Sequence, residues 1–374
     1  MSGSIEPYDT AKGRRYRIRY RKPDGTQTSK RGFKTQKEAK LRLADITVTK
    51  AKGDYVDPTA GRRTLTSYAN TWKIERLAPL KPSSRHAMET AWRVHVEPKW
   101  GTRAVDRITH TEIAAWVAEL NTTRSAQTVR RIVFVLNGIL TIAHRENAIP
   151  RNPATGITLP AKRRKPPRYL THQQVDTLVR SADTNEHATL IDLFAHAGLR
   201  WGEAAALRVR HLNPLRKRIR IEDNAVMVKG TYEHGTPKPG HTRDVPMPHH
   251  LVDQLTALTD GKGPDDYLFG DGTNPIPYPH ATSGWFVKAV RAARQTDPTI
   301  PAITPHDLRH TAASLAVASG AHVKAIQRML GHASAAMTLD VYADLFDDDL
   351  DAVAARMNEH RAAALGVSHL HAAR

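Results

Sequence analysis

The chain has 374 residues, 56 of them Lys or Arg and 37 Asp or Glu, which gives a formal net charge of +19. That length predicts two or three domains, and the basic balance predicts attraction to a polyanion, most often a nucleic acid. The absence of cysteine excludes disulfides, thiolate nucleophiles and cysteine-ligated metal sites.

Residues 1–60 are predicted to form a small basic module. Apolar residues alternate with arginines along the segment 15–21, which is the period of a β-strand with one basic face. A turn at Pro23-Asp24-Gly25, a second strand up to Phe33 and a helix over 36–48 follow. Such a module buries little apolar surface, so we expect its basic face to dock on DNA rather than stay solvated. The residues of that face are Arg15, Arg17, Arg19 and Arg21.

Residues 64–153 are predicted to form an all-helical domain. Its longest apolar stripe runs from Val129 to Ala143 at helical spacing, and Trp92, Trp100 and Trp116 are expected in its core. Residues 154–168 then read as a basic linker, which its prolines keep extended. We expect its cations to follow a DNA backbone. These cations are Lys162, Arg163, Arg164 and Lys165.

Residues 169–374 are predicted to form the largest domain, with helices around a small sheet. Thr171 is a cap residue for a first helix, and further helices are expected over 188–197, from Glu203, over 284–294 and from His306. Short strands are expected over 218–222, 225–228 and 242–245. The whole chain is therefore predicted to be multidomain and mainly α with small β-sheets, and its last domain to be α+β.

Four short motifs in this last domain fit one reaction. The transition state of phosphoryl transfer gains negative charge, which fork-shaped guanidinium groups are suited to hold. A tyrosine, with an ordinary pKa of about 10, attacks only with help. Each motif alone is weak evidence for such a reaction, but the occurrence of all four in this order and at this spacing is strong evidence. The motifs are Gly198-Leu199-Arg200-Trp201-Gly202-Glu203, His306-Asp307-Leu308-Arg309, Leu330-Gly331-His332 and Thr338-Leu339-Asp340-Val341-Tyr342.

In these motifs the chain resembles the tyrosine recombinases, the lambda-integrase-like family that includes the phage integrases. The resemblance covers essentially the whole chain, and the stretch from Thr338 to Met357 looks most like integrases of actinobacterial phages. It implies an arm-type DNA-binding domain, a core-binding domain and a catalytic domain. It also implies a site-specific recombinase that integrates phage or mobile-element DNA through a 3′-phosphotyrosine and a Holliday junction. Such an enzyme uses neither a metal nor another cofactor.

The resemblance assigns roles to five residues of the motifs. Arg200 and Arg309 hold the scissile phosphate, and His332 adds a hydrogen bond to it. His306 either assists proton transfer from the nucleophile or contacts the phosphate. The nucleophile is Tyr342.

A lysine and a glutamate are further expected to support the reaction. The leaving 5′-oxygen takes its proton from a lysine in this family. Lys238 is favoured because it shortly precedes an Arg-x-Val-Pro strand, and Lys229 is the alternative. Glu203 is expected to orient Arg200 or a neighbouring backbone group by hydrogen bonding.

The expected partners are double-stranded DNA with core-type and arm-type attachment sites, and copies of the chain in a synaptic homotetramer. A host DNA-bending factor and an excisionase are expected accessory proteins. No apolar leader or long apolar run occurs, so the bacterial cytoplasm, at the nucleoid, is the expected location. Two alternatives remain open: a catalytically dead DNA-binding regulator, and an enzyme like the type IB topoisomerases or telomere resolvases.

Overall fold

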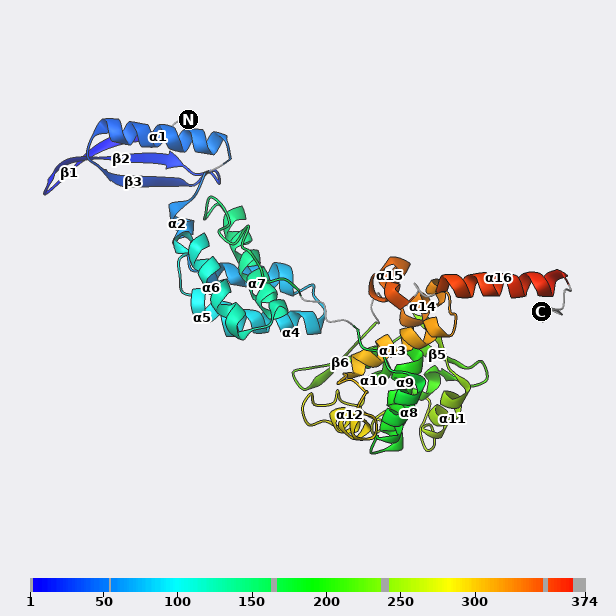
Figure 1. Cartoon of the computed structure of the whole chain (residues 1–374). Coiled ribbons are helices and arrows are strands. Elements are labelled where there is room, and N and C mark those ends of the chain that lie inside the picture. The colour runs from blue at the N-terminus through cyan, green and yellow to red at the C-terminus, as the bar shows by residue number, and fades with distance from the viewer. Residues whose placement is uncertain (1–2, 54, 163–166, 237–241, 346–348, 366–374) are drawn as a thin grey trace. The chain divides into compact units, whose positions relative to one another are not determined.

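The computed structural model describes residues 3–53, 55–162, 167–236, 242–345 and 349–365, and is shown in Figure 1. The chain divides into two compact units, Met1–Arg164 and Lys165–Arg374. The first unit holds a small sheet with one helix and an all-helical part. The second is an α+β unit, so the predicted class, mainly α with small sheets, is confirmed.

The N-terminal sheet is antiparallel and has the order β1-β2-β3. Its strands are β1 (Ser4–Thr10), β2 (Gly13–Arg21) and β3 (Gln27–Phe33), and α1 (Gln36–Ala51) covers one face. Ile18 and Tyr20 are buried beneath α1, against Ala39 and Ile46. Because side chains alternate along a strand, the arginines of β2 lie on the open face. β1 lacks apolar alternation and forms by pairing with β2 along its whole length.

The helical part of the first unit is built around four buried tryptophans: Trp72, Trp92, Trp100 and Trp116. Two of its helices continue through π-helical turns, Lys73–Leu77 after α3 and Trp92–Val96 after α4. The last three of these tryptophans were predicted in the core. The helices are α2 (Pro58–Gly61), α3 (Leu65–Trp72), α4 (Pro82–Ala91), α5 (Glu97–Trp100), α6 (His110–Thr123) and α7 (Ala126–Arg145).

The apolar helix α7 is the centre of this part. By length and composition it is apolar enough to cross a membrane, a property that the sequence analysis did not assign to any segment. Half of its most apolar 18-residue stretch is buried, however, and its apolar stripe packs against the neighbouring helices. Val129, Ile132, Leu136 and Ile139 are fully buried there. The apolar stripe of α7 is therefore explained by core packing.

The second unit packs its helices around the pair α9 (Asn185–Ala197) and α13 (Pro305–Ala318), which are in close contact. A capping box at Thr171 starts α8. Three strands, β4, β5 and β8, form an antiparallel sheet in that order, and β6 and β7 form a separate hairpin. The other elements are α8 (His172–Arg180), α10 (Trp201–Ala205), β4 (Leu212–Asn213), β5 (Arg218–Ile221), β6 (Asn224–Val228), β7 (Thr231–Gly235), β8 (Arg243–Pro246), α11 (His249–Ala257) and α12 (Trp285–Thr296).

The C-terminal part of this unit consists of α14 (Val323–Leu330), α15 (Ala335–Tyr342) and α16 (Asp349–Leu365). A 3₁₀ turn, Ala343–Leu345, follows α15, and α16 begins at Asp349. Met357 on α16 is 67% exposed, so within the second unit this side chain contributes little to the core.

Candidate active site

Arg200 stands at a tight turn between two helices. α9 ends at Gly198, whose φ of 65° is left-handed, and Arg200 is the cap residue of α10. A Cβ at Gly198 would lie 2.6 Å from the Leu330 side chain, so glycine permits both the turn and the close approach of α14. The turn brings the Arg200 guanidinium to the C-terminal end of α14, where it donates to the Gly331 carbonyl at 3.2 Å.

Glu203 is buried between two arginines, one three residues away in the sequence and the other 40 residues away. Arg200 Nη1 donates to its Oε1 at 2.8 Å, and Arg243 of β8 binds it with two hydrogen bonds of 3.0 and 2.7 Å. Burial alone would raise the pKa of Glu203, but the hydrogen bonds and charge of Arg243, with help from Arg200, hold it below its ordinary value. Glu203 is therefore a carboxylate at neutral pH and fixes both guanidinium groups.

The C-terminal end of α14 collects the side chains of the site. Four consecutive backbone carbonyls there each accept a side-chain hydrogen bond. Such carbonyls have no partner inside the helix, and the negative end of the helix dipole attracts cations. The end of α14 therefore supplies both the acceptors and the potential that hold three arginines together. The pairs are Arg243 with Met329, Arg309 with Leu330, Arg200 with Gly331 and Gln327 with His332.

Arg309 is the most deeply placed cation of the site. It lies on α13, is 3% exposed, and donates to the carbonyls of Gly198 and Leu330. Burial and the nearby charge of Arg200 lower its pKa, but a guanidinium stays protonated at neutral pH. Two arginines from different motifs, Arg200 and Arg309, thus present positive charge at one place.

His332 follows the left-handed Gly331 that ends α14. Its Nδ1 lies 2.9 Å from the hydroxyl of the buried Thr338, which fixes the ring. Burial and the charges of Arg309 and Arg200 lower the pKa of His332 to about 4. The ring is therefore neutral at physiological pH and keeps one N–H to donate. It is stacked on the ring of Tyr342, with centroids 6.4 Å apart and an interplanar angle of 8°.

Tyr342 ends α15 and is 1% exposed. Burial raises the pKa of its phenol to about 12, although Arg309 acts in the opposite direction. The hydroxyl lies 2.9 Å from Nδ1 of His310 on α13. His306, one turn earlier, is exposed and packs edge-on against His310 at 5.3 Å. The histidine beside the hydroxyl is thus His310, whereas the sequence analysis expected His306 either to assist the nucleophile or to contact the phosphate.

The structure describes only one of the two candidate lysines. Lys238 belongs to the segment 237–241, which is not described. Lys229 is exposed at the turn of the β6–β7 hairpin, with a left-handed φ of 52°. A hollow of about 400 Å³ beside His332 is bordered by Thr242 and Arg243, directly after the segment that carries Lys238.

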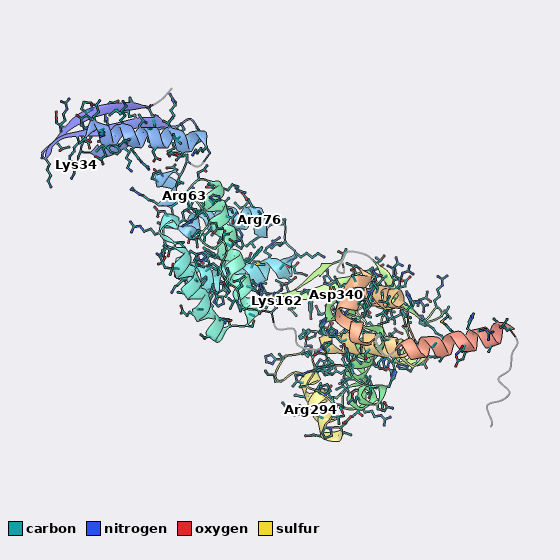
Figure 2. The ribbon with its side chains drawn as sticks, turned by 45° about the horizontal axis from the view of Figure 1, so that its top comes forward. Lys34, Arg63, Arg76, Lys162, Arg294 and Asp340 are labelled. Carbon is teal, nitrogen blue, oxygen red and sulfur yellow. The ribbon has the colours of Figure 1, made fainter. Side chains whose placement is uncertain are left out.

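The predicted DNA-binding cations belong to the first unit and the linker. On the open face of the N-terminal sheet, Arg17 forms an ion pair with Glu6 of β1 at 2.5 Å, and Arg19 lies 3.3 Å from the same carboxylate. Arg15 and Arg21 share this face. Lys162 is exposed, and cationic side chains such as Lys34, Arg63 and Arg76 are spread over the unit (Figure 2). Arg163, Arg164 and Lys165 lie outside the described residues.

Two known families match parts of the chain. Residues 168–348 match the phage integrase family, and residues 8–50 match an arm DNA-binding domain. The chain belongs to the phage integrase family of tyrosine recombinases. A tyrosine recombinase of Thermosipho africanus is 28% identical over 60% of this chain and 75% of its own length. An integrase of Streptomyces ambofaciens is 24% identical over 86% of both chains.

Solved integrase structures share the fold of this recombinase. The Tn1549 transposon integrase in complex with transposon right end DNA has a TM-score of 0.65 at 20% identity. The match covers 78% of this chain and 100% of the Tn1549 integrase chain in that structure. A lambda integrase tetramer bound to a Holliday junction gives a TM-score of 0.58 at 18% identity, over 88% of this chain and 95% of that one.

Sequence reasoning missed two residues of this candidate site. Arg243 was read only as a marker of its strand, although it holds Glu203 across 40 positions. His310 was given no role in the sequence analysis, although its place four residues after His306 puts it on the same helix face. Both contacts, Arg243 with Glu203 and His310 with Tyr342, arise from tertiary packing between distant segments, so neither had a local signal in the sequence.

Two other clusters in the described residues have metal-ligand composition: Asp192 with His196 and His250, and His211 with Glu222 and Asp223. His211 Nδ1 accepts the backbone N–H of Arg208 at 3.1 Å, so its Nε2 carries the proton. That N–H faces Glu222 at 3.2 Å. In the other cluster His196 Nδ1 lies 2.7 Å from Asp192. Hydrogen bonding thus accounts for the Asp192 cluster, whereas His211 Nε2 lies close to Glu222 without forming a hydrogen bond among the described residues.

Proposed function

We propose that this recombinase cuts and rejoins DNA at specific attachment sites through a covalent link between Tyr342 and a 3′-phosphate. The observation that carries the proposal is the convergence of three motifs at the end of α14. Arg309 and Arg200 bind consecutive carbonyls there, and the next residue, His332, stacks on Tyr342. Two fixed cations and a neutral N–H donor beside a phenol are the parts that phosphoryl transfer to tyrosine requires.

The two guanidinium groups and His332 would hold the non-bridging oxygens of the scissile phosphate. Because Glu203 and the α14 carbonyls already fix the arginines, little reorganisation is needed when negative charge grows on the phosphate. Loss of one such donor typically lowers a rate by about 10²–10³. Lys238 is our candidate for the acid that protonates the leaving 5′-oxygen, with Lys229 as the alternative.

The resulting phosphotyrosine keeps the energy of the phosphodiester, so strand exchange needs no nucleotide cofactor. We propose that four copies exchange strands in pairs through a Holliday junction, on the pattern of the lambda integrase tetramer. The arm DNA-binding domain would hold separate arm-type sites. An excisionase would turn the reaction from integration to excision, and a host DNA-bending factor would assist. The protein would act at the nucleoid, in a bacterial cytoplasm.

A nicked suicide duplex, taken from DNA that flanks the gene, tests the proposal. Cleavage next to the nick releases a short strand and traps the protein on the 3′-phosphate. We expect a denaturation-resistant protein–DNA complex with the wild-type chain and none with Tyr342→Phe, which keeps the buried ring but lacks the hydroxyl. Specific, non-covalent binding without a trapped complex would instead indicate a DNA-binding regulator and overturn the proposal.

A further inference from the structure

His310 and Tyr342 are joined by a hydrogen bond across two helices. His310 lies on α13, 32 residues before Tyr342 at the end of α15, and its Nδ1 is 2.9 Å from the hydroxyl. The two rings meet edge to face, with centroids 5.7 Å apart and an interplanar angle of 62°. This geometry directs a ring nitrogen at the atom that would attack DNA.

The chemistry of the two groups sets the direction of this hydrogen bond. A phenol carries its proton at neutral pH, and a neutral imidazole nitrogen accepts it. Burial and the neighbouring His306 lower the pKa of His310, which favours the neutral ring. Two charged groups that face the ring act on its pKa in opposite directions. Arg309 lowers this pKa, and Asp307 raises it without reversing the overall shift. Tyr342 therefore donates and His310 accepts.

The other histidines of the site are differently engaged. The ring of His332 lies parallel to that of Tyr342, and its Nδ1 is directed at Thr338. His306 is exposed, and its ring packs on His310. His310 is thus the histidine whose nitrogen already lies at hydrogen-bond distance from the nucleophilic oxygen.

We propose that His310 is a catalytic residue that accepts the proton of Tyr342 during DNA cleavage. The inference rests on the proposed function of Tyr342. As the Tyr342 oxygen bonds to phosphorus, its proton moves to Nδ1 of His310, and the ring becomes an imidazolium. The bond from phosphorus to the 5′-oxygen breaks, and that oxygen takes a proton from the separate acid. Rejoining reverses both transfers, so His310 returns the proton to the phenol.

Single-turnover cleavage of the suicide duplex tests this role with two variants. His310→Ala removes the acceptor, whereas His310→Asn places an amide oxygen near Nδ1 that accepts a hydrogen bond but not a proton. We expect both to lower the cleavage rate by about 10²–10⁴, the usual worth of a general base, with non-covalent DNA binding unchanged. His249→Ala, at an exposed histidine on α11, is the matched control and should cleave normally.

Two further readouts separate proton transfer from a structural role. The rate of His310→Ala should keep rising with pH toward the pKa of the phenol, whereas the wild-type rate should level off above the pKa of His310. A duplex with sulfur in place of the bridging 5′-oxygen needs no acid. On this duplex the His310 variants should still cleave slowly, because His310 acts on the nucleophile and not on the leaving group.

Three results would overturn the inference while leaving Tyr342 as nucleophile. They are near wild-type cleavage by His310→Asn, faster cleavage by His310→Ala, and rescue by the 5′-sulfur substrate. The first would leave His310 a purely positioning residue, the second would make it a restraint on the tyrosine, and the third would make it the acid. Failure of the wild-type chain to form any covalent complex would instead refute the proposed function itself.

Discussion

At the scale of single residues, the site depends on a carboxylate that is fully out of water. The side chain of Glu203 is 0% exposed, and that of Arg243, its bidentate partner, is 11% exposed. Taking such charges out of water is costly, and removing one partner leaves the other uncompensated. Glu203 is therefore required both for the stability of the catalytic unit and for the position of Arg200.

Glu203→Gln should destabilise the protein by about 3–5 kcal/mol, since two guanidinium groups lose their shared counter-charge. The melting temperature of the catalytic unit should fall by roughly 6–20 °C, at about 2–4 °C per kcal/mol for a unit of this size. Glu222→Gln is the control, because that carboxylate is partly exposed and pairs with an exposed Arg220. Its effect should stay within about 1 kcal/mol. Equal melting temperatures for the two variants would contradict the prediction.

The lowered pKa of Glu203 also predicts how stability depends on pH. The folded chain keeps Glu203 ionised where the unfolded chain, with an ordinary pKa of about 4.3, has begun to bind a proton. The contribution of Glu203 is therefore complete above that value and is lost as pH falls through the folded pKa. Unfolding of Glu203→Gln, measured between about pH 3 and 6, should show a shallower acid slope than the wild type. An unchanged slope would show that other carboxylates carry it.

At the scale of elements, α14 positions the site through its C-terminal end. Gly331 must be left-handed to turn the chain toward His332, and a Cβ there would lie 2.9 Å from Nη1 of Arg243. Gly261, after α11, has a similar φ of 70° but open space around it. The two glycines share backbone strain and differ in this contact.

Gly331→Ala should therefore impair cleavage beyond the effect of strain. Both alanine variants pay about 1–2 kcal/mol for the left-handed backbone. Only Gly331→Ala displaces Arg243 and turns His332, so its cleavage rate should fall by roughly tenfold or more while Gly261→Ala cleaves normally. Comparable cleavage by the two variants at equal stability would sink this account of the α14 end.

The elements that sequence predicted are those with a local signal. The cap at Thr171, the alternation of β2 and the apolar stripe of α7 each follow from neighbouring residues. β1 and β7 lack such a pattern, because they are held mainly by pairing with a neighbouring strand. Sequence also indicated the motif residues, but not that His310 meets Tyr342 or that Arg243 meets Glu203, because these contacts arise from packing between distant segments.

At the scale of the whole molecule, a net charge of +19 favours DNA binding, but it is not all available to phosphates. On the open face of the N-terminal sheet, Glu6 occupies Arg17 and Arg19. Arg15 shares that face without an ion pair among the described contacts. The carboxylate therefore reduces the positive charge that this arm DNA-binding domain offers to a duplex.

Glu6→Gln should strengthen binding of duplex DNA, because it frees two cations, and should steepen its salt dependence. Arg15→Ala should do the opposite and reduce the slope of log K against log salt by about 0.9, the loss of one phosphate contact. Fluorescence anisotropy with a labelled duplex between 50 and 200 mM salt, the range over which such contacts weaken strongly, measures both. Asp45→Asn matches Glu6→Gln in charge, but Asp45 lies on α1, which covers the other face, where it pairs with Arg42. If Asp45→Asn tightened binding as much as Glu6→Gln, net charge rather than the sheet face would govern affinity.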